Sequence, residues 1–262
     1  MAYNIIEWIS FFFVYSFFGW CFECTLCSIE TKHFINRGFL RGPYIPIYGF
    51  GAITMIFAAI PVMDNPTLVF LCGALSATLL EYVTGTLMEV IFKTRYWDYS
   101  DCHYQINGRI CAEATLMWGF LTLFVNYNVH THIVNLIKHI NVTVLTTADI
   151  ILCTLFIADY IISFKSAVDV ASISKRLYEI KTEATSLIEK LSDKNTASDR
   201  IISIRKKLDK LQAERNSISK KIGVFQKSFI KSHPKAHMSK HNYTFKELLS
   251  LIHISEPTRL DV

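Results

Sequence analysis

Long apolar stretches dominate residues 1–165 of this 262-residue chain and constrain its fold more than any other feature. About 20 residues of helix cross the hydrocarbon core of a bilayer, so a run near this length predicts a transmembrane helix. The predicted spans are residues 5–29, 48–63, 67–92, 110–127 and 142–164. The first span has no basic start and no small-residue cleavage site, so we expect it to be retained. We therefore predict an all-α polytopic membrane bundle of about five spans.

Basic residues are distributed unevenly among the connections between these spans. The connections after the first and third spans contain Lys32, Arg37, Arg41, Lys93, Arg95 and Arg109, whereas the others contain only Lys138. Because positive charge marks cytoplasmic loops, this pattern predicts an amino terminus outside and a carboxyl tail in the cytoplasm. Between the last two spans, residues 130–139 alternate apolar and polar residues at near-helical spacing, which predicts a short helix at the membrane interface.

Residues 36–51 contain an unusual density of glycine and proline for a segment flanked by apolar runs. Gly38 and Gly42 permit backbone angles closed to other residues, and Pro43 and Pro46 remove two amide donors, so a regular helix cannot run through them. Irregular backbone at membrane depth persists only where protein or a water-filled cavity satisfies its polar groups. We therefore predict a broken or re-entrant segment before the second span, covered by neighbouring helices.

The same residues carry a resemblance to a known family. Asn36–Leu40 (NRGFL) and Gly42–Gly51 (GPYIPIYGFG), with the later blocks 97–100 (WDYS), 107–111 (NGRIC) and 118–119 (WG), resemble a family of bacterial multi-pass membrane proteins catalogued as ABC-transporter type IV permeases, CmpB-like. The resemblance covers about residues 8–165. It implies a transport permease of the bacterial plasma membrane that draws its energy from a separate ABC ATPase subunit.

Several carboxylates interrupt the predicted spans. A carboxylate at the centre of a spanning helix costs about 2.5–3.5 kcal/mol on insertion scales, so each requires a partner or a function. On the third span, Gly73, Ala77, Glu81, Gly85 and Glu89 recur every four residues and form one stripe, which predicts close helix contact broken by acids. Glu81 is expected near the membrane midplane. The other acids, Glu23, Glu89 and Glu113, are expected in the cytoplasmic half beside Arg37, Arg41, Arg95 and Arg109.

Two interpretations of these charges remain open. The acids and arginines can pair as structural bridges that lock the broken segment to the bundle, or they can form a polar pathway or binding cavity for a charged solute. Tyr44, Tyr48, Trp97 and Tyr99 fit interfacial anchors best, and Asp98 can accept from Arg95 or Arg109. In the fifth span we expect Asp159 to be more buried than Asp149. The candidate binding or pathway residues are Glu23, Asn36, Arg37, Arg41, Tyr44, Tyr48, Glu81, Glu89, Asp98, Arg109 and Glu113.

Neither a catalytic nor a metal site is predicted. No Ser-His-Asp order, His-Glu-x-x-His motif or phosphate-binding glycine loop is present, so we expect no enzyme activity and no cofactor, with paired Glu or Asp chemistry as the remaining alternative. Cys21, Cys24 and Cys27 are spaced like metal ligands but fan around an apolar helix, where thiols act as small hydrophobes. Cys102 and Cys111 flank a predicted cytoplasmic loop, where a structural disulfide is not expected.

After residue 164 the sequence becomes charged and helix-prone. Apolar residues recur at alternating spacings of three and four over residues 170–191 and 201–229, which is typical of a coiled-coil seam. Turn-forming residues at 192–199 favour a helical hairpin, while continuation of the register through Lys194 and Ser198 favours one long helix pairing with another subunit. The net charge of +8 in residues 166–262, against −3 in residues 1–165, favours contact with anionic lipid headgroups; no nucleic-acid motif is present.

The last residues require separate treatment. Residues 166–232 are predicted to form the coiled coil or hairpin and residues 233–248 a flexible tail. Residues 249–262 include Leu-Ser-Leu-Ile-His-Ile-Ser-Glu-Pro-Thr-Arg, which resembles the translation of a sequencing adapter, so we expect the native carboxyl terminus to be missing there.

These observations support two functional hypotheses. The first is a permease subunit in the lipid bilayer that moves a solute with a separate ATPase, since the chain lacks a Gly-x-x-x-x-Gly-Lys-Ser/Thr loop of its own. Its small size favours a homo-oligomer, most simply a dimer. The alternative is a scaffold or sensor that recruits partners to the membrane through its tail.

Overall fold

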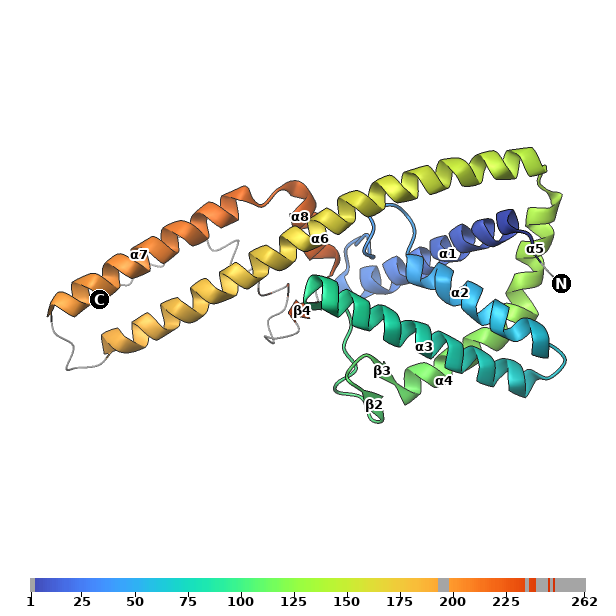
Figure 1. Cartoon of the computed structure of the whole chain (residues 1–262), viewed down its shortest axis with the longest axis horizontal. Coiled ribbons are helices and arrows are strands. Elements are labelled where there is room, and N and C mark those ends of the chain that lie inside the picture. The colour runs from blue at the N-terminus through green and yellow to red at the C-terminus, as the bar shows by residue number, and fades with distance from the viewer. Residues whose placement is uncertain (1–2, 193–197, 234–235, 239–244, 246, 248–262) are drawn as a thin grey trace. The chain divides into compact units, whose positions relative to one another are not determined.

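The computed structural model is nearly all helical and describes residues 3–192, 198–233, 236–238, 245 and 247 (Figure 1). The predicted adapter sequence, and residues 193–197 of the turn-forming stretch, lie outside the described residues. The chain divides into two compact units. The first contains residues 1–91 and 95–164, and the second contains residues 92–94 and 165–262.

The first unit begins with α1 (Ile5–Thr31), α2 (Pro46–Ala59) and α3 (Pro66–Phe92). A capping box fixes the start of α1, because Asn4 Oδ1 accepts from the Glu7 amide at 2.9 Å and the Glu7 carboxylate accepts from the Asn4 amide at 2.8 Å. Prolines occupy the first positions of α2 and α3, where a missing amide donor costs nothing. A short 3₁₀ turn, Ile60–Val62, extends α2.

Three helices complete the bundle. They are α4 (Ala112–Phe124), α5 (His130–His139) and α6 (Val142–Ser192), with a π-helical turn at Val125–Val129 joining the first two. The five apolar runs of the sequence therefore coincide with five helices, and α5 has the bounds predicted for the interfacial helix. The fifth predicted span continues without a break into the charged sequence, so α6 has 51 residues.

Among the described residues, three helices are long and apolar enough to cross a membrane: Ile5–Glu30, Pro66–Phe92 and Val142–Leu191. The apolar helix Pro46–Val62 is shorter, as is α4, which has 13 residues. Large apolar side chains remain exposed on these helices, including Phe57 at 70 % and Leu75 at 69 %. Such surfaces suit lipid, not water. The chain is thus a helical membrane protein with three candidate membrane-spanning helices among its described residues.

Glycines bring the helices of the first unit close together. A Cβ at Gly49 of α2 would collide with Ser16 and Phe12 of α1, and one at Gly73 of α3 would collide with Thr122 of α4. Ala77, one turn after Gly73, is also buried. The small residues of the predicted stripe therefore do mark close contacts made by α3.

The apolar face of α5 closes one end of the bundle. Ile133, Val134 and Ile137 pack into a core with Phe11 of α1 and Ile56 of α2, and Figure 1 shows α5 crossing near the start of α1. At the first turn of α5, His130 lies between the hydroxyls of Tyr15 and Tyr3, each 3.1 Å from a ring nitrogen.

Four short strands accompany the helices: β1 (Thr94–Arg95), β2 (Gln105–Ile106), β3 (Ile110–Cys111) and β4 (His237–Met238). β2 pairs with β3 antiparallel, Ile106 opposite Ile110, and β1 pairs with β4. The β2–β3 hairpin lies between α3 and α4 in the chain. It positions several of the candidate residues described below.

The second unit contains the end of α6, α7 (Ser198–Lys221) and α8 (Val224–Ser232). Side chains of the predicted seam, Ile180 and Leu187 of α6 with Ile204 and Leu211 of α7, form a separate apolar cluster. The two helices therefore face one another within one chain (Figure 1), as the hairpin alternative requires. Within residues 233–248, predicted to be flexible, β4 forms and Ala236, Met238 and Phe245 are buried.

Candidate functional site

The broken segment between α1 and α2 is fastened to α6 by one carboxylate. Asp159 Oδ2 accepts from the amides of Arg41 at 2.9 Å and Gly42 at 2.8 Å, and from the Tyr44 hydroxyl at 3.2 Å. Ser163 donates to the other oxygen at 3.1 Å. A carboxylate that accepts several donors satisfies backbone groups which no helix can pair. The sequence predicted that neighbouring helices cover this segment, but it did not identify Asp159 as the residue that accepts hydrogen bonds from its backbone.

The burial predicted for the two α6 aspartates was wrong. Asp149 is only 6 % exposed and accepts from Ser10 at 2.8 Å, whereas Asp159 is partly exposed. Position along the helix suggested the opposite order. The neighbouring helix decides it, since α1 covers Asp149 while Asp159 lies at the edge of the broken segment.

A second set of contacts joins the broken segment to α1. Tyr48 donates to Glu23 Oε1 at 2.7 Å, and Arg37 Nε lies 3.8 Å from Glu23 Oε2. Asn36 accepts from Trp20 at 2.6 Å and donates to the Arg41 carbonyl at 2.7 Å. Glu23 is therefore a paired carboxylate with one phenol and one guanidinium partner.

Glu81 of α3 is the most buried of the candidate carboxylates, at 6 % exposure. Its two oxygens accept from the Tyr99 hydroxyl at 3.0 Å and from Trp118 Nε1 at 2.9 Å. Both donors are neutral, and no basic side chain in the described ranges lies within ion-pair distance of it. Burial first, and next the Glu81 carboxylate, raises the pKa of Tyr99 above its ordinary value, so the hydroxyl keeps its proton and remains a donor.

The contacts of Glu23 and Glu81 lie near one another. Tyr48, which binds Glu23, is close enough to Tyr99, which binds Glu81, for the two phenols to interact electrostatically. Tyr48 packs against Gly19 of α1, where a Cβ would collide with its ring. Tyr44, Tyr48 and Tyr99 therefore direct their hydroxyls to carboxylates. Their position at the membrane interface stays a prediction.

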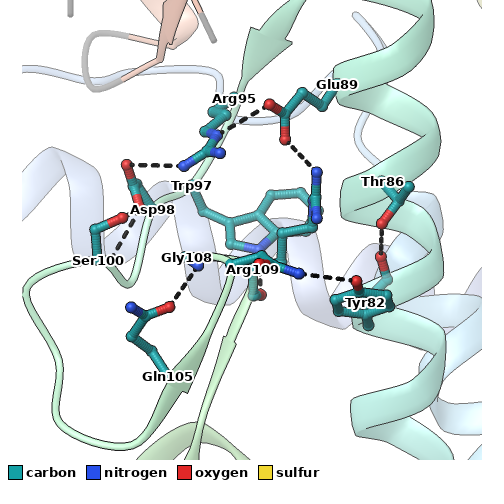
Figure 2. Close-up of polar contacts among 11 residues, drawn as sticks. Tyr82, Thr86, Glu89, Arg95, Trp97, Asp98, Ser100, Gln105, Gly108 and Arg109 are labelled. Carbon is teal, nitrogen blue, oxygen red and sulfur yellow. Dashed lines mark hydrogen bonds and ion pairs between the residues drawn. The ribbon is translucent and has the colours of Figure 1, made fainter.

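A fourth cluster surrounds Glu89 at the end of α3 (Figure 2). Arg95 Nε and Arg109 lie 3.2 Å and 2.8 Å from its two carboxylate oxygens. Arg95 also lies 3.7 Å from Asp98, and the Arg109 guanidinium lies over the Tyr82 ring, 5.6 Å from its centroid. These contacts attach the connection between α3 and α4 to the last turns of α3.

The Asn107-Gly108-Arg109 motif shapes this connection. Asn107 and Gly108 have positive φ, 54° and 68°, and the Arg109 amide donates to the Ile106 carbonyl at 3.1 Å, which closes a tight hairpin turn. A Cβ at Gly108 would meet Asp98 and Ser100. Trp97 Nε1 donates to the Arg109 carbonyl at 3.1 Å, so two of the family blocks form one folded loop.

Most of the predicted site residues are thus brought together, in three neighbouring sets around Glu23, Glu81 and Glu89. Glu113 is not among them: it is exposed, and no basic side chain in the described ranges forms an ion pair with it. Arg41 and Tyr44 contact Asp159 instead, through the Arg41 amide and the Tyr44 hydroxyl, and the Arg41 carbonyl accepts from Asn36. Sequence reasoning did not include Tyr82, Trp118 and Asp159 among the candidate site residues. For Tyr82 and Trp118 a signal exists, because a phenol or indole in an apolar helix close to a carboxylate can donate a hydrogen bond to it.

The described residues contain no group of three or more His, Cys, Asp or Glu side chains that could hold a metal ion. The candidate site contains carboxylates that accept hydrogen bonds from phenol, indole and guanidinium groups. Such an arrangement can bind a charged or hydrogen-bonding solute, or can lock helices together.

Comparison with known proteins identifies the family of the chain. No curated protein and no solved structure matches it. The family described as "Putative ABC-transporter type IV" matches residues 10–164, which is more than half of the chain and includes all three sets of contacts. The chain belongs to this ABC-transporter type IV family, also designated CmpB.

Proposed function

We propose that this protein is the permease subunit of an ABC-type transporter in the bacterial plasma membrane, moving a charged solute with energy from a separate ATPase. The family and the three candidate spans support the membrane and transport parts of the proposal. In it, α2 and α4 also span the bilayer, the amino terminus is outside, and the α6–α7 pair is a cytoplasmic coiled coil.

The observation that carries the proposal is the state of Glu81. A buried carboxylate in a spanning helix is costly unless it has a partner or a function. Glu23 and Glu89 have arginine partners, whereas the partners of Glu81 in the part of the chain that the structure describes are the neutral donors Tyr99 and Trp118. Neutral donors satisfy its oxygens without supplying a countercharge, so a cationic solute can serve as the countercharge of an ionised Glu81. Tyr48 and Tyr99 connect this group with Glu23 and the broken segment.

Replacement of Glu81 by Gln tests this role. The amide keeps the size of the side chain and removes the charge, so a pathway residue predicts normal expression with loss of transport-coupled ATP hydrolysis by the complex in proteoliposomes. Glu183→Gln, on the exposed face of α6, is the control and should leave hydrolysis unchanged. Loss of expression or membrane insertion in Glu81→Gln would instead make the carboxylate structural.

The scaffold alternative rests on a different observation, the separate apolar core shared by α6 and α7. A scaffold tolerates Glu81→Gln and loses its partner when Leu177, which is buried on α6, and Leu208, which packs against that core, are replaced by Ser. A permease instead loses its activity in the Glu81→Gln variant.

A further inference from the structure

Two cysteines of the connection between α3 and α4 meet in the folded chain. The thiols of Cys102 and Cys111 are hydrogen-bonded to one another, and both cysteines are free. Cys102 is partly exposed, whereas Cys111 is buried. The sequence placed the two cysteines at the ends of a loop but did not bring their side chains together. Two free thiols in contact can be joined by oxidation, so this pair is a candidate redox site.

The backbone of the loop holds the two cysteines in place. The Ala112 amide donates to the Tyr104 carbonyl at 3.2 Å, next to the β2–β3 pairing that contains Cys111. The Cys102 amide donates to the Tyr99 carbonyl at 2.9 Å, and Tyr104 has a positive φ of 50°, so the chain turns back toward the start of α4. Both sulfur atoms also lie close enough to the Tyr99 side chain to interact with it electrostatically. The meeting of the thiols therefore follows from the fold of the loop.

The two cysteines differ in accessibility and in how firmly they are held. Cys111 is the N-cap of α4, and its sulfur accepts from the Ala114 amide at 3.4 Å. Cys102 lies outside the helices and strands, in the turn before β2. The S–S bond of a disulfide is about 2.05 Å long, so the two sulfurs must move closer to form one. The turn that contains Cys102 can supply this movement while α4 holds Cys111.

The surroundings of Cys102 set how fast it can react. Partial burial first, and next the Cys111 sulfur and the carboxylates of Glu113 and Asp101, raise the pKa of the Cys102 thiol above its ordinary value. The thiolate is the reactive form of cysteine, and little of it is present at neutral pH when the pKa is raised. Oxidation of the pair should therefore be slow at neutral pH and faster as the pH rises.

We propose that Cys102 and Cys111 are a redox site that forms a reversible disulfide when the protein meets hydrogen peroxide. The Cys102 thiolate attacks one peroxide oxygen, the O–O bond breaks, and the departing hydroxide takes up a proton, which gives a sulfenic acid and water. The Cys111 sulfur then attacks the Cys102 sulfur, the S–O bond breaks, and the hydroxide leaves with the Cys111 proton as a second water. The two thiols lose two electrons, which the peroxide gains.

The bond would join the two segments that supply the hydrogen-bond donors of Glu81. Tyr99 precedes Cys102 in the loop, and Trp118 lies on α4, which begins after Cys111. In a reducing cytoplasm such disulfides are transient, and many of them sense oxidants. The site lies within the first unit and does not depend on transport, so it is expected in a permease and in a scaffold alike.

Peptide mapping of the full chain, purified in mild detergent with reductant, tests the proposal. Trypsin cleaves after Arg95 and Arg109, which places Cys102 in residues 96–109 and Cys111 in residues 110–138, each with one cysteine. The reductant is removed, the protein is treated with hydrogen peroxide, free thiols are blocked with N-ethylmaleimide, and the digest is analysed by mass spectrometry. We expect the disulfide-linked pair of peptides to rise several-fold with peroxide and to disappear after dithiothreitol.

Serine variants separate the roles of the two cysteines. In Cys111→Ser the sulfenic acid at Cys102 has no resolving thiol, so dimedone should label Cys102 several-fold more than in the wild type. In Cys102→Ser the buried Cys111 should remain a thiol after the same treatment. Cys153→Ser, which removes a partly exposed cysteine of α6, is the control and should leave the linked pair unchanged. Size-exclusion elution and helical circular dichroism establish that each variant is folded; serine is itself a preferred N-cap, so it suits position 111.

Three outcomes would overturn the proposal. The first is no linked pair at peroxide concentrations that oxidise other cysteines of the chain. The second is a linked pair found only in a dimer band on a non-reducing gel, because the bond then joins two copies. The third is a linked pair of equal amount in chain isolated from cells with its thiols blocked at lysis, with or without peroxide, which makes the bond a permanent structural disulfide.

Discussion

At the residue scale, the carboxylates of the bundle differ in how their charge is satisfied. Glu89 has two arginines, Glu23 has one arginine and a tyrosine, and Glu81 has a tyrosine and a tryptophan. The first two arrangements stabilise a fold by neutralising charge. The third places a carboxylate without a cationic partner among the described residues at the most buried of the three positions, which is why we propose the functional role for it.

Glu89→Gln should destabilise the protein. The substitution leaves the guanidinium groups of Arg95 and Arg109, 24 % and 18 % exposed, without their charged acceptor. Hydrogen bonds to charged groups contribute about 1.5–3 kcal/mol each, and partial exposure places the loss near the lower value, about 1.5 kcal/mol. Thermal unfolding in detergent should show a lower midpoint for Glu89→Gln than for Glu113→Gln, whose exposed carboxylate has no such partners. Equal midpoints would mean that the Glu89 cluster does not hold the loop.

Sequence reasoning identified the charged residues at this scale better than it identified their partners. Glu23, Glu81 and Glu89 stood out because carboxylates in apolar runs need compensation, and Arg37, Arg95 and Arg109 were the nearest basic groups. Helical spacing gives the face on which a residue lies but not the neighbour that meets that face. For this reason Asp159, Trp118 and the hydroxyls of Tyr48 and Tyr99 received no partner, and Asp149 was taken as the more exposed aspartate.

At the scale of elements, the positions of the helices followed from apolar length and from the prolines and glycines between them. The structure adds two features that a periodicity cannot provide. One is the π-helical turn at Val125–Val129, which joins α4 to α5, and the other is the continuity of α6 from its apolar half into its charged half. Nothing in a local sequence pattern requires a helix to end where hydrophobicity ends.

Two glycines of the bundle offer a matched test of helix packing. A Cβ at Gly73 would collide with Thr122, whereas one at Gly51 meets nothing within 4 Å. Gly73→Ala should therefore lower the unfolding midpoint, since overpacking costs about 1–3 kcal/mol. Gly51→Ala should raise it slightly, by about 0.5–1 kcal/mol of stability, because alanine is the better helix former. The same direction of change in both variants would contradict the α3–α4 contact.

The α6–α7 pair should weaken in acid. Arg176 donates to both oxygens of Glu214, at 2.7 Å and 3.0 Å, and these hydrogen bonds lower the pKa of Glu214. A carboxylate whose folded pKa is depressed contributes stability above its unfolded pKa of about 4.3 and loses it as pH falls through the lower folded value. Helical circular dichroism of the full chain on heating should show a larger acid-induced loss for the wild type than for Glu214→Gln. An equal loss in both would contradict this assignment.

At the scale of the whole molecule, the number of membrane crossings separates two topologies. With five spans the Asp64-Asn65 turn is outside and the β2–β3 hairpin is cytoplasmic; if only α1, α3 and α6 cross, both assignments reverse while the termini keep their sides. Reporters active on one side only, inserted at these two positions, distinguish the two cases. The account predicts an external signal at the turn and a cytoplasmic signal at the hairpin, because Lys93, Arg95 and Arg109 then lie inside.

The central claim is that this chain works as a permease subunit with a separate ATPase. Its most direct test is crosslinking in cells of its native type, purification of the tagged full chain in mild detergent, and identification of the co-purifying proteins by mass spectrometry. The account predicts a nucleotide-binding ATPase recovered in fixed ratio to the chain. Recovery of self-linked copies alone, or of a soluble partner without ATPase motifs, would contradict it and make the α6–α7 tail the working part.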